Sequence, residues 1–151
     1  ESESRGLGDV YKRQTINSMW GKDSKIDDIM LDQSTIKIPQ LHQKYLSLHG
    51  EFKLLLAKKK QELKKVQHGK WLYYSGKAKP EVYADKPFDY KVMKSDVPSW
   101  VAVDDDINRL EMQVEYYNTV LDTLAEILRQ VHQLSFNIKN IIAWRTFTGG
   151  V

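Results

Sequence analysis

The chain has 151 residues, of which 41% are hydrophobic and 28% charged, and its formal net charge at pH 7 is +3. That size is typical of one domain, or of a compact head with a long helical arm. The absence of cysteine excludes disulfides, thiolate zinc sites and thiol nucleophiles. No apolar run approaches the roughly 20 residues of a membrane span, and no signal-peptide core is visible. We therefore expect a protein without a membrane segment.

The charge is unevenly distributed along the chain. Residues 53–94 contain 12 lysines and four acids, a balance of +8. Residues 96–126 contain eight acids and one arginine, a balance of −7. Such an asymmetry indicates a polyanionic partner, or acidic and basic surfaces that meet between subunits.

Three regions are predicted along the chain. Residues 1–14 lack apolar periodicity and are expected to be a non-native or disordered leader without function. Residues 15–103 are expected to form an N-terminal nucleic-acid-binding region. Residues 104–151 are expected to form a C-terminal oligomerisation helix.

The first helices are predicted between residues 15 and 75. A short amphipathic helix is expected around residues 26–30, with Asp23 or Ser24 as its cap. A long helix is expected to begin near Ile38, because Pro39 suits the first helical position. Its apolar stripe repeats at steps of four and three and consists of Leu41, Tyr45, Leu48, Phe52 and Leu55.

A basic and aromatic segment follows at residues 58–79. It holds eight lysines and no arginine, against the single acid Glu62. Lysines can neutralise phosphates while aromatic rings stack on unpaired bases, so this pattern favours single-stranded nucleic acid. The alternative is a solvated helix end, capped by Gly76, whose aromatic residues belong to the core. The candidate nucleic-acid-binding residues are Lys64, Lys65, His68, Lys70, Trp71, Tyr73, Tyr74 and Lys77.

Residues 77–103 contain three of the four prolines and cannot form one regular element. The alternation of Phe88, Tyr90 and Val92 with polar residues predicts a short strand, with residues 100–103 as its partner. A short β-hairpin or an ordered loop would then join two long helices. Tyr83, Phe88, Tyr90 and Trp100 either extend the stacking surface or pack this connection onto the helices.

A second long helix is predicted from Asp104, which can cap it, to residue 148. Its apolar residues keep a strict seven-residue repeat, which is typical of a coiled coil. The last third carries apolar residues outside this repeat, which indicates self-association; the alternative is a fuller core within one subunit. The fold class is therefore mainly α, with two long helices and oligomerisation through the C-terminal helix. The residues expected at the subunit contacts are Leu121, Leu124, Leu128, Val131, Leu134, Ile138, Ile141 and Ile142.

No catalytic machinery is recognisable in the sequence. The phosphate-binding patterns GxxxxGK[ST] and GxGxxG are both missing. His42 and His49 lie seven residues apart, but nothing completes a metal-ligand set. We therefore predict a protein that is not an enzyme and that needs no cofactor and no metal.

Two segments resemble the UvsY family, the recombination mediators of T4-like phages. One is KWLYYSGKA, in which Tyr73 to Gly76 coincide with the family's YYSG sequence. The other is the ending IKNIIAWRTF, which is similar to the family's closing pattern. Lys70 stands where the family has an arginine and His68 where it has a lysine. These departures weaken the match, since lysine cannot form the bidentate phosphate contact of arginine and histidine is mostly neutral at pH 7.

The resemblance implies a homo-oligomeric ring that binds single-stranded DNA without sequence preference. It also implies that the protein helps a RecA-like phage recombinase displace a single-strand-binding protein, in the cytoplasm of the infected bacterial host. The basic segment and the heptad helix agree with this implication. The alternative is a structural coiled-coil virion protein, or an adapter protein, with a solvating lysine face.

Overall fold

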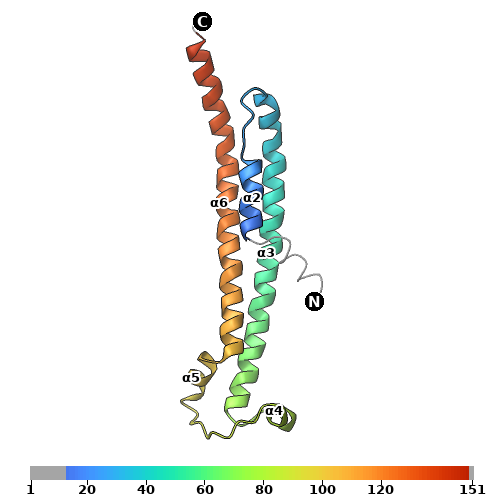
Figure 1. Cartoon of the computed structure of the whole chain (residues 1–151), viewed down its shortest axis with the longest axis vertical. Helices are drawn as coiled ribbons and strands as arrows, with labels where there is room; N and C mark the ends of the chain where they lie inside the picture. The colour runs from blue at the N-terminus through green and yellow to red at the C-terminus, as the bar shows by residue number, and fades with distance from the viewer. Residues whose placement is uncertain (1–12, 150–151) are drawn as a thin grey trace. The chain divides into compact units, whose positions relative to one another are not determined.

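The structure is a computed structural model that describes residues 13–149 (Figure 1). This part of the chain is mainly helical, as predicted, and contains no strand. No helix in it is long and apolar enough to cross a membrane. The helices are α2 (Arg13–Asp23), α3 (Leu31–Tyr74), α4 (Pro80–Asp85), α5 (Val97–Ala102) and α6 (Asp105–Thr148).

The predicted leader falls mostly outside the described residues, which begin at Arg13. Arg13 and Gln14 form the first turn of α2, so the end of the leader is helical. That residues 1–14 are a non-native or disordered leader stays a prediction.

The described chain forms two compact units. The first unit contains α2, α3 up to Lys53 and α6 from Thr119 onward, and the second contains residues 54–118. Each long helix therefore contributes to both units. This division differs from the predicted boundary between a functional region at residues 15–103 and another at residues 104–151. Those two functional regions stay predictions.

The first unit packs three helices around one apolar core. Ring contacts and hydrogen bonds join α2 to both long helices, beside which it lies in Figure 1. The buried side chains follow the steps of three and four that place residues on one helix face. They are Ile16, Leu41, Tyr45, Leu48, Phe52, Val120, Leu124, Ile127, Val131, Leu134 and Ile138.

Helix α3 begins at Leu31, well before the predicted start near Ile38. The Asp27 carboxylate accepts backbone N–H bonds from Ile29 (2.9 Å) and Met30 (3.2 Å). Ser34 in turn accepts the backbone N–H of Asp27 at 3.0 Å. These bonds satisfy backbone N–H groups just before α3 and order the connection that leads into it. The predicted helix at residues 26–30 is wrong, because this segment is part of the connection between α2 and α3.

Pro39 lies inside α3, not at its first position. A proline removes one helical N–H bond and crowds the preceding turn, yet the helix continues through it. The prediction that Pro39 marks the start of the helix is therefore wrong.

Asp23 anchors α2 to α3. Its Oδ2 atom accepts a hydrogen bond from the Tyr45 hydroxyl at 2.8 Å and pairs with the Lys44 ammonium at 2.7 Å. Burial raises the pKa of the Asp23 carboxyl, but the hydrogen bonds from Lys44 and Tyr45 outweigh it and hold the pKa below its ordinary value. Since the folded pKa is lowered, this stabilisation is present above about pH 5 and is lost as the pH falls below about 4.

Replacing Tyr45 with phenylalanine should lower the free energy of unfolding by about 1–2 kcal/mol at pH 7, because a charged acceptor loses its donor. Urea unfolding at pH 7 and pH 3 measures the effect, which should be smaller at pH 3. Tyr90→Phe is the control, since Tyr90 is exposed and should lose less than about 0.5 kcal/mol. Equal losses in both variants would contradict the anchoring role.

The buried stripe of α6 departs from the predicted heptad after Tyr117. A strict repeat continues with Leu121 and Leu128, but the fully buried residues are Val120 and Ile127. The step from Tyr117 to Val120 is three residues where the repeat requires four. The buried face of α6 is therefore rotated about the helix axis from Val120 onward, because this half of α6 packs against α2 as well as α3. The seven-residue spacing continues in this half of α6, but Val120 and Ile127 are buried in place of the predicted Leu121 and Leu128.

This shift divides the predicted oligomerisation residues. Leu124, Val131, Leu134 and Ile138 are buried inside the first unit, so within one subunit they are core residues. Leu121, Leu128 and Ile141 are half-buried, and Ile142 is 50% exposed. Oligomerisation itself stays a prediction, and the surface available for it lies further along α6.

In the second unit, two short helices replace the predicted β-hairpin. Pro80 lies at the start of α4 and Pro98 at the start of α5, where a missing N–H costs least. The segment 86–96 between them forms no strand. The predicted alternation reflects aromatic packing, since Phe88 lies against Tyr74 and Trp100 with ring centroids 5.2 and 5.5 Å apart. The alternative of an ordered loop describes this segment correctly.

Candidate nucleic-acid interface

Gly76 ends α3 as predicted, with a positive φ of 75°. Its N–H bonds the Tyr73 carbonyl at 3.2 Å, and the Lys77 N–H bonds the Leu72 carbonyl at 2.9 Å. This pair of bonds is the Schellman motif, which requires a left-handed residue and therefore favours glycine. The YYSG sequence thus has a structural purpose at the end of the basic helix.

Three of the predicted cationic residues lie on the exposed side of α3. Lys64, Lys65 and His68 are all exposed, and within residues 13–149 neither lysine forms an ion pair. Helical spacing places Lys65 and His68 opposite the apolar face that carries Leu56 and Leu63, and Lys64 at the side of that face. Lysines without carboxylate partners are available to phosphates.

Lys70 differs from these residues, because two carboxylates hold its ammonium. Its Nζ lies 2.9 Å from Asp106 and 3.3 Å from Asp104, and the side chain is largely buried. Burial lowers the pKa of Lys70, but the hydrogen bonds to Asp106 and Asp104 outweigh it and raise the pKa. The sequence predicts that the positive charge of Lys70 contacts a phosphate, but in the structure these two carboxylates neutralise it within the subunit. A phosphate contact by Lys70 stays a prediction, and it would require these ion pairs to open.

Tyr73 and Tyr74 also have partners within the unit. The Tyr74 hydroxyl donates to Asp104 Oδ2 at 2.6 Å, and the Tyr73 hydroxyl donates to the Lys86 carbonyl at 3.0 Å. The Tyr73 ring stacks on Tyr83 with a centroid distance of 5.4 Å and an interplanar angle of 17°. Base stacking by either ring stays a prediction, and the packing favours an anchoring role for both.

Asp104 joins the end of α3 to the start of α6. Its Oδ1 accepts the N–H groups of Asp106 (2.9 Å) and Ile107 (3.3 Å), which makes it the predicted cap of α6. Burial raises the pKa of Asp104, but bonds from Tyr74, the Ile107 N–H and Lys70 outweigh it and lower the pKa. One carboxylate therefore serves the helix cap, a tyrosine and a lysine.

Trp71 and Lys77, the remaining candidates, lie together. The Lys77 ammonium lies over the Trp71 ring, 5.3 Å from its centroid, and Lys77 is exposed while Trp71 is half-buried. This cation–π contact holds a positive charge beside a flat ring at the end of α3. A nucleotide phosphate and base could use this pair together.

The sequence interpretation missed the role of Asp104 and Asp106 as partners of Lys70. The only available signal was the acidic block after residue 96, which balances the lysine block before it. It named Tyr83 as a stacking or packing residue but not its bonds: the Tyr83 hydroxyl donates to the Tyr73 carbonyl at 2.8 Å and accepts the Ala78 N–H at 3.2 Å. No local pattern reveals such a contact between α4 and the end of α3.

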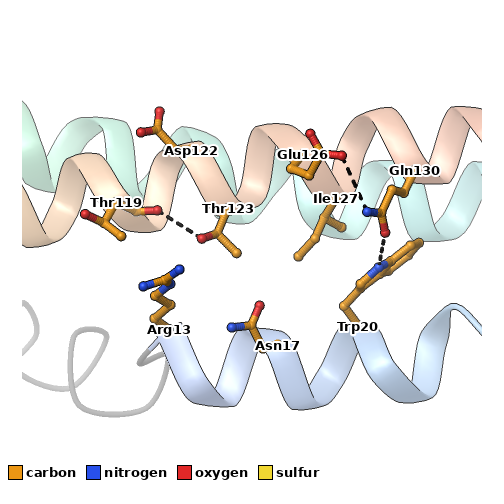
Figure 2. A pocket seen from close by; sticks show the side chains of 9 residues that line it. All are labelled: Arg13, Asn17, Trp20, Thr119, Asp122, Thr123, Glu126, Ile127 and Gln130. Carbon is orange, nitrogen blue, oxygen red and sulfur yellow. Dashed lines mark hydrogen bonds between the residues drawn. The ribbon is translucent and has the colours of Figure 1, made fainter.

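The first unit has a groove of about 460 Å³ between α2 and α6 (Figure 2). Trp20 donates to the Gln130 side chain at 2.6 Å at one end, and Asp122 and Glu126 contribute carboxylates to the lining. Arg13 also lines the groove, but the two carboxylates leave the lining with a net negative charge, which disfavours phosphates. Within residues 13–149 no group of three histidines or acids could hold a metal ion.

The fold and the candidate site define the class of this protein. It is a helical protein in which a lysine-bearing helix ends at a glycine cap, next to a cluster of aromatic rings. The family model described as "Recombination, repair and ssDNA binding protein UvsY" matches residues 19–151. The chain belongs to the UvsY family. The matched residues start after the predicted leader.

The relatives agree with this assignment. The recombination protein uvsY of Enterobacteria phage T4 is 23% identical over 129 residues, covering 85% of this chain and 91% of that protein. A crystal structure of the bacteriophage T4 recombination mediator protein UvsY, in lattice type II, superposes with a TM-score of 0.78. It is 22% identical and covers 91% of this chain and 97% of that chain. The lattice type IV structure gives a TM-score of 0.76 at 20% identity, with coverages of 91% and 99%. At these identities the structures establish a shared fold.

Proposed function

We propose that this protein is a recombination mediator that binds single-stranded DNA along the exposed side of α3. In this proposal it helps load a RecA-like phage recombinase onto DNA coated by a single-strand-binding protein. Family membership supports recombination, repair and single-stranded DNA binding as its field of action. The observation that carries the site is the exposure of Lys64 and Lys65, without ion pairs among the described residues. The host-cell cytoplasm is the corresponding location.

The phosphate contacts are assigned to Lys64, Lys65 and Lys77, with His68 beside them. Lys70, Tyr73 and Tyr74 hold the end of α3 against α4 and the start of α6. They are therefore proposed to position the exposed lysines, because their own polar groups are already bonded.

Self-association completes the proposal. One subunit offers few exposed lysines and should bind weakly, whereas several linked subunits turn later contacts into intramolecular ones. The proposed contact is the end of α6, where every residue from Ile142 to Gly149 is exposed. Phe147 (80%) and Trp144 (65%) are apolar side chains left open to solvent there. Exposed apolar groups of this kind are typical of subunit contacts.

Replacing Lys64 and Lys65 together with alanine should weaken binding to fluorescent oligo-dT and reduce its salt dependence. Two lost phosphate contacts per bound site should reduce the log–log slope by about 1.4, at about 0.7 each. Titrations at several salt concentrations measure the slope. Lys22→Ala/Lys25→Ala removes the same charge from exposed positions in the first unit and should leave the slope unchanged. Equal slopes for the Lys64/Lys65 variant and the wild type would refute the assigned site.

The virion or adapter alternative makes a different prediction for the same titration. A solvating lysine face would give no oligonucleotide affinity even at low salt, in any variant. Loading is tested by adding the wild type and the Lys64/Lys65 variant to a recombinase reaction on coated single strands. The variant should stimulate that reaction less.

A further inference from the structure

Six aromatic rings form one cluster in the second unit, and one of them differs from the others. Tyr73, Tyr74 and Tyr83 donate their hydroxyls to partners within the unit, and their rings are half-buried. Phe88 and Trp100 are half-buried between other rings. Tyr90 is 71% exposed, and its hydroxyl has no hydrogen-bond partner among the described residues.

The exposed Tyr90 ring is nevertheless held in place. Its centroid lies 5.7 Å from those of Phe88 and Trp100, with interplanar angles of 54° and 38°. Trp100 and Phe88 in turn contact Tyr74, whose hydroxyl is fixed by Asp104. A ring supported in this way loses little conformational freedom when a ligand stacks on it.

Lysines lie close to Tyr90 along the chain. Residues 86–94 contain three lysines and one aspartate, and Lys86, Lys91 and Lys94 are all exposed. The Lys86 carbonyl accepts the Tyr73 hydroxyl, which fixes this lysine's backbone at the cluster. A flat exposed ring in a segment with exposed lysines matches a ligand with a π-face and a phosphate, which is a nucleotide of a single strand.

We propose that Tyr90 is the base-stacking residue of the DNA site, in place of Tyr73 and Tyr74. This inference rests on the proposed function and names the residue that contacts a base. Lys91 and Lys94 would hold the adjoining phosphates. The rings of Tyr73, Tyr74, Phe88 and Trp100 form the rigid support beneath Tyr90.

The test is the affinity of full-length Tyr90→Ala for fluorescent oligo-dT at fixed low salt. We expect a loss of about 5- to 150-fold, which is the range for one stacked base, with an unchanged log–log salt slope because no charge is removed. Tyr90→Phe keeps the ring and should bind within about threefold of the wild type. Met93→Ala is the matched control, since Met93 is also 71% exposed in the same segment but has no ring.

The outcomes separate this inference from the proposed function. If the wild type binds and the Lys64/Lys65 variant loses slope, while Tyr90→Ala binds as the wild type does, the inference is overturned and the proposed function stands. The exposed ring would then serve a contact with a protein. If the wild type does not bind oligo-dT at low salt, the proposed function and the role of Tyr90 are both refuted.

If circular dichroism shows that Tyr90→Ala is misfolded, photo-crosslinking of the wild type tests whether Tyr90 contacts a base. The wild type is irradiated with an oligonucleotide that contains 5-iododeoxyuridine, and the crosslinked peptides are identified by mass spectrometry. A crosslink at Tyr90 supports the proposal. Crosslinks confined to other residues overturn it.

Discussion

Replacing Asp104 with alanine is expected to lower the free energy of unfolding by about 2–4 kcal/mol at pH 7. The substitution removes the cap of α6, which alone is worth about 0.5–2 kcal/mol. It also leaves the Tyr74 hydroxyl and one side of the largely buried Lys70 ammonium without their acceptor. Urea or thermal unfolding measures the loss.

Two matched variants separate these contributions. Asp105→Ala removes an exposed carboxylate from the next position and should cost less than about 0.5 kcal/mol. Asp104→Asn keeps a good capping side chain but removes the charge, so its loss should be intermediate. A loss in Asp104→Ala no larger than in Asp105→Ala would contradict the account of this carboxylate.

The pH dependence of the Asp104→Ala effect follows from the pKa of the carboxyls. Asp104 has its pKa lowered, as described, and hydrogen bonding from Lys70 lowers the pKa of Asp106. A carboxyl with a lowered folded pKa stabilises the protein above its unfolded pKa and loses that contribution as the pH falls through the folded value. The difference between wild type and Asp104→Ala should therefore be full above about pH 5 and shrink below about pH 4.

Replacing Trp144 and Phe147 with glutamate is expected to dissociate the protein without unfolding the subunit. Both side chains are exposed at the end of α6, so charge there adds little to the free energy of the folded subunit but opposes an apolar contact. Sedimentation should show a smaller mass at micromolar concentration. Affinity for a long oligo-dT should fall by about 10²-fold or more, because avidity is lost.

Controls for this variant use the same unit. Gln33→Glu/Gln40→Glu adds the same charge to exposed positions of α3 and should leave the mass unchanged. Ile138→Asp should unfold the first unit, since Ile138 is buried in its core and a charge there cannot be solvated. An unchanged mass for the Trp144/Phe147 variant would exclude this end of α6 as the subunit contact.

Local signals in the sequence were enough to predict the main helices. The lysine helix, its termination at Gly76 and the capping of α6 by Asp104 depend on residues close together in the chain. The steps of three and four also identified the apolar face of α3 correctly as far as Phe52, but the next buried residue is Leu56 and not the predicted Leu55.

The wrong predictions concern places where segments that are far apart in the sequence pack against each other. The α6 stripe shifts at Val120 because α2 packs there, and nothing in the repeat announces that helix. Alternating aromatics at residues 88–92 imitate a strand, but their rings pack into a cluster with Tyr74 and Trp100.

The candidate site shows the same division. Composition identified the basic helix correctly, but it could not tell exposed Lys64 from paired Lys70, because Asp106 lies 36 positions further along the chain. It also could not show that Tyr73 and Tyr74 have bonded hydroxyls, while the Tyr90 hydroxyl has no partner within residues 13–149.

The central claim is that linked subunits hold one single strand on their lysine-bearing helices. Sedimentation of dye-labelled oligo-dT with the wild-type protein, followed at the wavelength of the dye, tests binding and assembly together. The account predicts that at low salt the dye sediments with the mass of several subunits plus the oligonucleotide. Dye that sediments as free oligonucleotide, beside a protein with the mass of one chain, would contradict the account.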